Sequence, residues 1–446
     1  MGNGTTEQLA GASDWQTISA VVIFLTVYVL VIMERFKRSY VALSGAAVML
    51  LLGIVDVPKA FSTYIVWETL ALLAGMTILI GLVHRTGLFH FLALKAVMAV
   101  KEKPMLMLVA MTFVAAVMAA LTDNLTAMLV MTPITLLIAP ILGVTPVPYL
   151  ISQIIAANIG GTATLVGSLP NLLIGSANSH LTYGSFLVVL GPAVLAILII
   201  VILLLAIVYR GRLRDGEPNK KKMKKFDSDR AAADPLRMKI GAAVMILTLT
   251  GFILSESIGI DKSIVALIGA GIMLFAGVKP VEWQGAIKHV EKDMILFFVG
   301  FFVIVGGLNE VGIFQKIALM ALQITNGELP NLALLVLGVS GIASATTDAA
   351  SYTVMMIPFV QELGVQLNIA SPHDLNVVWW SLALGASLGS GGTLTGSPAN
   401  AVVAALAERE GKGFRYSSYL KVGVPVALLS LLLAGLYVHY VFPLIQ

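Results

Sequence analysis

The chain has 446 residues, of which 58% are hydrophobic and 12% charged, and it contains no cysteine. The absence of cysteine excludes disulfides, thiolate metal sites and thiol nucleophiles. Several apolar stretches are long enough to cross a hydrocarbon core of about 30 Å, and none alternates like the roughly ten-residue strands of an outer-membrane barrel. The composition therefore indicates a polytopic helical membrane protein.

The apolar segments form two sets separated by one polar, basic stretch. The first set lies near residues 17–34, 39–55, 67–83, 150–178 and 184–209. After "YRGRLRDGEPNKKKMKKFDSDR" at 209–230, the second set lies near 238–256, 262–278, 293–309, 374–406 and 418–441. Each set carries one further apolar segment with a polar centre, at 104–145 and 330–363.

The two sets are internal repeats. "SYVALSGAAVMLLLG" from residue 39 matches "SIVALIGAGIMLFAG" from 263, and "GGTATLVGSLPN" from 160 matches "GGTLTGSPAN", which ends at 400. The first polar centre, Thr122-Asp123, is matched by Thr347-Asp348. We therefore divide the chain into a first repeat at 1–208, a basic linker at 209–237 and a second repeat at 238–446.

The basic residues predict the orientation of the repeats, because cytoplasmic loops concentrate lysine and arginine. With five transmembrane helices and one re-entrant hairpin in each repeat, 25 of the 28 basic residues become cytoplasmic, and Lys59, Lys262 and Lys316 face outward. The linker is then cytoplasmic, and both termini are periplasmic in a bacterial or archaeal inner membrane. An odd number of crossings inverts one repeat relative to the other.

The predicted fold is thus an all-α membrane protein of two inverted repeats, with about ten helices, two re-entrant hairpins and interrupted helices at the midplane. Inverted repeats with interrupted helices are typical of secondary transporters, whose substrate sites lie where the repeats meet. Non-helical backbone at that depth is tolerated where it lines a cavity.

Asp123 and Asp348 are the two clearest deep carboxylates in the chain. Each precedes an apolar run and could serve only as a helix N-cap. A charge within the membrane is costly, however, and an asparagine would cap without it. We therefore favour capping combined with binding of protons or cations.

The two interrupted helices and the hairpin tips supply the candidate substrate-binding groups. Broken helices expose backbone groups and half-helix ends that bind ions or hydroxyl-bearing solutes, although small residues also allow close helix packing. The candidates in the first repeat are Thr122, Asn124, Asn158, Gly160, Gly161, Thr162, Thr164, Ser168 and Asn171. Those in the second are Thr347, Ser390, Gly391, Thr393, Thr395, Ser397 and Asn400.

Other features restrict the chemistry. No phosphate-binding glycine loop with its lysine is present, the six histidines lack metal-ligand spacing, and no core segment contains lysine or arginine. We expect no enzymatic activity, cofactor, metal site or nucleic-acid partner. The missing core cation favours a neutral solute or a cation over a multivalent anion.

The chain contains "TDNLTAMLVMTPIT", "NIGGTATLVGSLPNLLIG", "YTVMMIP" and "GTLTGSPANAV". Together these motifs resemble the ion-transporter superfamily over about residues 17–441. Within it the chain most resembles the arsenite–antimonite efflux permease (ArsB) family, which is related to the NhaD sodium–proton antiporters and the P protein. The resemblance implies a scaffold of outer helices around a transport domain of hairpins and broken helices. Ala349 and "GSGGT" depart from the usual second-half pattern, which puts a sodium site there in doubt.

These observations predict a secondary transporter that exports arsenite or antimonite, as the neutral trihydroxy form, in exchange for protons. A sodium–proton antiporter is the alternative, and a carboxylate or sulfate symporter is weakened by the missing midplane cation. A further alternative is the channel subunit of a pump driven by a soluble arsenite-stimulated ATPase, with 209–230 as the dock. A homodimer in the lipid bilayer is also compatible with the sequence.

Overall fold

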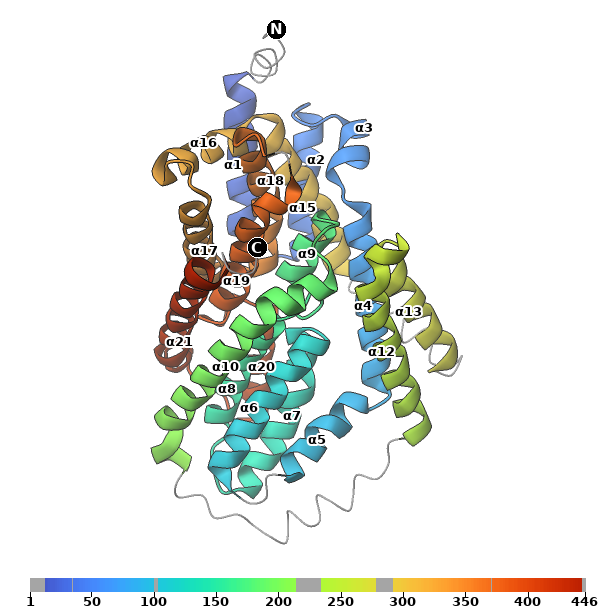
Figure 1. Ribbon diagram of the computed structural model, residues 1–446, viewed down its shortest axis with the longest axis vertical. Helices are drawn as coiled ribbons and strands as arrows, with labels where there is room; N and C mark the ends of the chain where they lie inside the picture. The colour runs from blue at the N-terminus through green and yellow to red at the C-terminus, as the bar shows by residue number, and fades with distance from the viewer. Residues whose placement is uncertain are drawn as a thin grey trace.

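The computed structural model describes residues 13–33, 35–99, 103–213, 234–277, 292–369 and 371–442. Regular structure in these ranges is helical throughout (Figure 1). Nine of the described helices are long and apolar enough to cross a membrane, and four shorter apolar helices accompany them. The predicted all-α membrane architecture is confirmed.

The first repeat begins with α1 (Asp14–Ile32), α2 (Arg38–Leu51) and a short outer segment. That segment comprises α3 (Val57–Lys59) and the π-helix η2 (Ala60–Tyr64). There follow α4 (Trp67–Arg85), α5 (Leu88–Ala99), the hairpin α6 (Pro104–Leu121) and α7 (Asn124–Ile141), the interrupted pair α8 (Val147–Gly161) and α9 (Leu169–Ala177), and α10 (Tyr183–Leu213).

The second repeat has the same order of elements. It comprises α12 (Pro235–Ile258), α13 (Lys262–Ala276), α15 (Lys292–Glu310), α16 (Ile313–Thr325), the hairpin α17 (Leu329–Thr346) and α18 (Ala349–Gln366), η4 (Pro372–Leu375), the interrupted pair α19 (Asn376–Ser390) and α20 (Pro398–Arg409), α21 (Tyr416–Leu436) and η5 (Tyr437–Val441). Each repeat therefore has five crossings, counting the interrupted pair as one, and one hairpin.

The repeats are inverted and interlocked. In Figure 1 the hairpin α6–α7 lies in the lower half of the molecule and α17–α18 in the upper half. Helix α2 packs against α15 while α4 packs against α13, and α7 packs against α20 while α9 packs against α18. The α2–α15 contact in one direction is repeated as α13–α4 in the other, and α7–α20 is repeated as α18–α9. An internal two-fold axis relating the repeats requires such pairs.

Two glycines confirm the register between the repeats. A Cβ on Gly160 would lie 2.2 Å from the carbonyl oxygen of Ala116, and a Cβ on Gly389 would lie 2.2 Å from that of Gly341. These are the same contact in α8–α6 and in α19–α17. Only glycine permits helix backbones to approach so closely.

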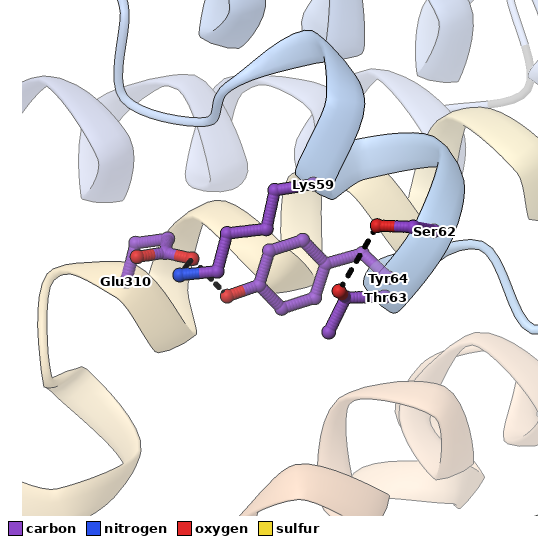
Figure 2. Close-up of polar contacts among 5 residues, drawn as sticks. All are labelled: Lys59, Ser62, Thr63, Tyr64 and Glu310. Carbon is purple, nitrogen blue, oxygen red and sulfur yellow. Dashed lines mark hydrogen bonds and ion pairs between the residues drawn. The ribbon is translucent and has the colours of Figure 1, made fainter.

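A polar contact ties the outer segment of the first repeat to the second. Figure 2 shows the Lys59 ammonium and the Tyr64 hydroxyl converging on the Glu310 carboxylate at the end of α15. The Tyr64 ring also lies against the backbone of Gly306 on α15. The outer segment therefore braces α15, which lines the central cavity described below.

Charge counting assigned Lys262 to an outward-facing loop, but its side chain is buried. The Lys262 ammonium donates to the carbonyl oxygens of Gly175 at 2.6 Å, Leu181 at 2.8 Å and Asn178 at 3.2 Å. These carbonyls belong to the end of α9 and the residues after it, where a helix leaves acceptors unpaired. The lysine thus links α13 of one repeat to the broken helix of the other.

The domain boundaries remain predictions. Helix α10 continues to Leu213 and α12 begins at Pro235, so the predicted linker at 209–237 shares residues with both helices. Most of the linker, including most of the proposed ATPase dock at 209–230, lies outside the described residues.

Candidate functional site

Asp123 and Asp348 occupy equivalent places at the tips of the two hairpins. The Asp123 carboxylate accepts the Thr126 N–H at 2.8 Å, which caps α7. The Asp348 carboxylate accepts the N–H and the hydroxyl of Ser351, at 3.1 and 2.8 Å, which caps α18. The capping role anticipated from sequence is therefore present in both repeats.

The threonine before each aspartate is directed back into its own hairpin. The hydroxyls of Thr122 and Thr347 each donate to a carbonyl one turn earlier, on Met118 and Ala343, at 2.8 Å. Neither threonine lines the cavity described below. Their bonds close the last turns of α6 and α17.

Two asparagines hold the breaks in the interrupted helices. Asn171 donates to the carbonyls of Thr164 at 2.8 Å and Thr162 at 3.0 Å. Asn400 does the same to Thr393 at 2.8 Å and Ser390 at 2.9 Å. The amides thereby satisfy carbonyls that the helix break would leave without partners.

Threonines attach each break to the neighbouring hairpin. Thr164 donates to the Ala120 carbonyl at 2.6 Å, and Thr393 donates to that of Ala345. Each threonine also accepts a backbone N–H within its own break, from Gly167 and Gly396. The hairpin tips and the breaks are therefore parts of one structure.

A network of side chains joins the repeats at the centre. The Asn158 amide donates to the Asn400 side-chain oxygen at 2.8 Å, while its oxygen accepts from Ser390 at 3.0 Å and Asn124 at 3.1 Å. Asn124 also donates to Ser397 at 3.2 Å. Asn124 begins α7, Ser390 ends α19, and Ser397 and Asn400 lie at the start of α20. These helix ends are distant in sequence and meet only in the folded molecule.

The corresponding network on the other side is smaller. Ser387, the counterpart of Asn158, lies 3.0 Å from Ser168 and donates to Asn171 at 3.5 Å. Ala349 stands where the first repeat has Asn124, so no amide reaches across. The centre is thus two-fold in backbone but asymmetric in side chains.

One cavity of about 740 Å³ contains both aspartates. Seven predicted site residues line it, namely Asp123, Asn124, Asn158, Ser168, Asp348, Ser390 and Ser397. The remaining predicted residues do not: Thr122, Gly160, Gly161, Thr162, Thr164, Asn171, Thr347, Gly391, Thr393, Thr395 and Asn400. Of these, Gly161 packs tightly against Gly167, and Gly391 against Asn158. Thr162 bonds to the Asn158 carbonyl, and Thr395 bonds to the Thr393 hydroxyl, both near the breaks.

Sequence reasoning missed four ionisable residues on the cavity wall. Lys37, Arg38 and His84 lie there with Asp293, whose carboxylate is 4.0 Å from the Lys37 ammonium. All four are at helix ends, in α2, α4 and α15 or next to them. Their position along the chain gave no signal that the cavity reaches them.

Four helices begin at the cavity. The first residues of α7, α9, α18 and α20 line it, as do the N-caps Asp123, Ser168, Asp348 and Ser397. A helix N-terminus favours negative charge through its free N–H groups and its dipole. Aspartates occupy two of these ends, and the other two, with Ser168 and Ser397 at the N-cap position, carry no charge of their own.

The comparisons agree with this architecture. The chain is 34% identical to the uncharacterized transporter Rv2684 of Mycobacterium tuberculosis, over 94% of this chain and 97% of the relative. It is 28% identical to the mouse P protein, over 95% of this chain and 60% of that protein. The fold also matches the crystal structure of the Alcanivorax borkumensis YdaH transporter, which is described as having an unusual topology. That match has a TM-score of 0.59 and 14% sequence identity, and it covers 96% of this chain and 98% of that chain.

The resemblance to the P protein noted from sequence is thus confirmed, and the protein is a membrane transporter. The family model described as "Citrate transporter" matches residues 28–385 and 257–445. The chain belongs to the citrate transporter family.

Proposed function

We propose that this protein is a secondary transporter that carries a small carboxylate-bearing anion together with cations bound at Asp123 and Asp348. One observation carries the proposal: a single cavity holds both hairpin-tip carboxylates, two helix N-termini with serine at the N-cap, and a wall where Lys37, Arg38 and His84 outnumber the one carboxylate, Asp293. The family's description as citrate transporters supports the same class of substrate.

The arrangement explains how anion and cation transport would be coupled. The backbone N–H groups at the starts of α9 and α20, to which Pro170 and Pro398 contribute none, and the Ser168 and Ser397 hydroxyls offer donors to a carboxylate. Two ionised aspartates in the same cavity would repel that carboxylate. Binding of a proton or Na⁺ at Asp123 and Asp348 removes the repulsion, so the anion binds tightly only with its cations.

The basic residues on the cavity wall make an anionic substrate possible, although the sequence favoured a neutral solute or a cation. Lys37, Arg38 and His84 reach the cavity from helix ends, so an anion bound there does not lack a counter-charge. The volume of about 740 Å³ also falls within the roughly 300–1,000 Å³ of small-molecule sites. A solute of four heavy atoms would leave most of it unfilled.

Arsenite or antimonite export in exchange for protons is the second candidate. The network of Asn124, Asn158, Ser390 and Ser397 favours it, because these side chains are uncharged and offer both donors and acceptors to hydroxyl groups. Sodium–proton antiport needs only the two aspartates. The inner-membrane location, the cytoplasmic linker, the ATPase partner and the homodimer stay predictions.

Purified protein in liposomes distinguishes these functions. We expect citrate or another small carboxylate to exchange across the membrane without a gradient, and to accumulate when a pH or sodium gradient is imposed. Arsenite flux with no carboxylate flux would replace the first candidate by the second. Sodium-driven proton movement with neither solute would establish the antiporter instead.

A further inference from the structure

Helices α6, α7 and α8 enclose a group of buried polar side chains away from the substrate cavity. Thr112 on α6, Thr132 on α7 and Gln153 on α8 are each at most 1% exposed. The two hydroxyls and the Gln153 amide nitrogen have no hydrogen-bond partner among the described residues. The Gln153 oxygen accepts from Thr135 at 2.9 Å, which joins α7 to α8 at this level.

Contacts between α6 and α8 indicate that Thr112 and Gln153 lie on the facing sides of these helices, and the Thr135–Gln153 bond brings α7 beside them. We call these buried polar positions the seam. The Tyr149 hydroxyl bonds to the Pro104 carbonyl, and Gly160 touches Ala116, so α6 and α8 run parallel in fixed register. Thr112 lies one turn before Ala116 on the same face of α6, and Gln153 lies two turns before Gly160 on the same face of α8. Measured along the parallel helix axes, Thr112 and Gln153 are therefore separated by about one helical turn.

The seam leads toward the substrate cavity. Thr132 lies one turn nearer than Thr135 to the start of α7, which Asp123 caps. Gln153 lies five residues before Asn158, which lines the cavity and bonds to Asn124. The seam is therefore built on the same helices that carry Asp123 and Asn158, with Thr132 nine residues from Asp123 along the chain.

The second repeat lacks this seam. The alignment of the two repeats is fixed by matched residues, because Pro133 aligns with Pro358 and Gly160 with Gly389. Thr112, Thr132, Thr135 and Gln153 then correspond to Leu337, Ile357, Val360 and Leu382. At these four positions the same helix packing forms with apolar residues, and the buried polar pair in the second hairpin, Ser340 and Tyr352, is hydrogen-bonded at 3.2 Å.

Buried hydroxyl and amide groups without protein partners are the usual binding sites of internal water. In helices, threonine normally bonds to the carbonyl one turn back, as Thr135 does to Met131 at 2.8 Å. Thr112 and Thr132 do not. Their donors, with the two N–H groups of Gln153, would anchor a short file of water between the three helices.

We propose that this seam holds buried water and conducts protons to Asp123, a route that exists only in the first repeat. The conduction step rests on the proposed function, in which Asp123 binds the coupling cation, whereas the hydration does not. Water joined to Thr112, Thr132 and Gln153 can pass protons by exchange of hydrogen bonds. Asp348 is then served by the substrate cavity alone.

Cysteine reactivity tests the hydration, since the chain has no native cysteine. Thr132→Cys and its counterpart Ile357→Cys would be reacted with Ag⁺ or a small methanethiosulfonate in detergent. We expect the reaction at position 132 to be at least tenfold faster than at position 357. Equal rates would overturn the proposal, and Thr112→Cys against Leu337→Cys provides a second pair should the first fold poorly.

A second experiment separates conduction from substrate binding. The combined variant Thr112→Val, Thr132→Val and Gln153→Leu gives the first repeat an apolar seam. We expect gradient-free substrate exchange to stay within twofold of wild type, while transport driven by a pH gradient falls at least tenfold. Ser381→Ala, which removes a buried hydroxyl outside the seam, should change neither.

Equal loss of both activities, or loss of neither, would overturn the proton route. Absence of any carboxylate or arsenite exchange in the wild type would instead reject the proposed function. The cysteine reaction needs no substrate, so it still decides whether the seam is hydrated.

Discussion

Asn158 donates its side-chain amide to the side-chain oxygen of Asn400 at 2.8 Å, joining two residues 242 positions apart. Both are fully buried or nearly so, and each also bonds within its own broken helix. The pair connects the interrupted helices of the two repeats at the point where the cavity lies between them.

Asn158→Ala should impair both stability and transport. It leaves the side-chain oxygen of Asn400 without its donor and removes one bond each from Asn124 and Ser390. An unsatisfied buried polar group costs about 1–3 kcal/mol. We expect a lower melting temperature in detergent and at least a tenfold loss of substrate exchange. Asn158→Ser, which copies the residue at the equivalent position 387, should recover part of the stability. Unchanged transport in both variants would contradict a role in the site.

Asp123→Asn and Asp348→Asn test whether the aspartates are present for their charge. Asparagine also caps helices, so folding should be largely preserved. The side chain no longer binds a proton or Na⁺, and gradient-driven transport should fall in at least one variant while gradient-free exchange survives. Wild-type gradient-driven accumulation in both variants and in the double variant would leave capping as the only role.

Lys262→Met removes the ammonium that bonds to three carbonyls at the end of α9. Hydrogen bonds to a charged group contribute about 1.5–3 kcal/mol, so we expect a clear decrease in melting temperature. Lys316→Met, at an exposed lysine on α16, is the matched control and should leave the melting temperature unchanged. An equal effect of the two substitutions would argue against the buried clamp.

Gly160→Ala and Gly389→Ala should each disrupt helix packing. The added Cβ would lie 2.2 Å from a backbone oxygen of α6 or α17, and backbone cannot move aside as a flexible side chain can. Overpacking of this kind costs about 1–3 kcal/mol. Gly338→Ala on α17 meets nothing within 4 Å, so its melting temperature should not fall. Yields and melting temperatures of the three variants provide the comparison.

The orientation predicted from charge can be tested with single cysteines. An impermeant thiol reagent added outside intact cells should label Ser62→Cys, which is exposed in the outer segment. It should not label Lys222→Cys in the linker until the cells are opened. The reverse pattern would invert the topology.

Much of the fold was determined by the sequence alone. Apolar length defined the crossings, and matched polar interruptions such as Thr122-Asp123 and Thr347-Asp348 identified the hairpins and the repeats. These features are readable because lipid tolerates unpaired polar groups so poorly that each interruption needs a structural reason. The capping roles of Asp123 and Asp348 were also predictable, since a cap acts within its own helix.

Only the tertiary structure decided which polar groups face the cavity. Asn171 and Thr164 face backbone carbonyls rather than the cavity, whereas Lys37 and His84 line it from helix ends. The burial of Lys262 likewise depends on α9, more than 80 residues away in sequence. The orientation of a side chain around a broken or terminal helix turn is set by contacts between the two repeats, and those contacts have no local signature in the chain.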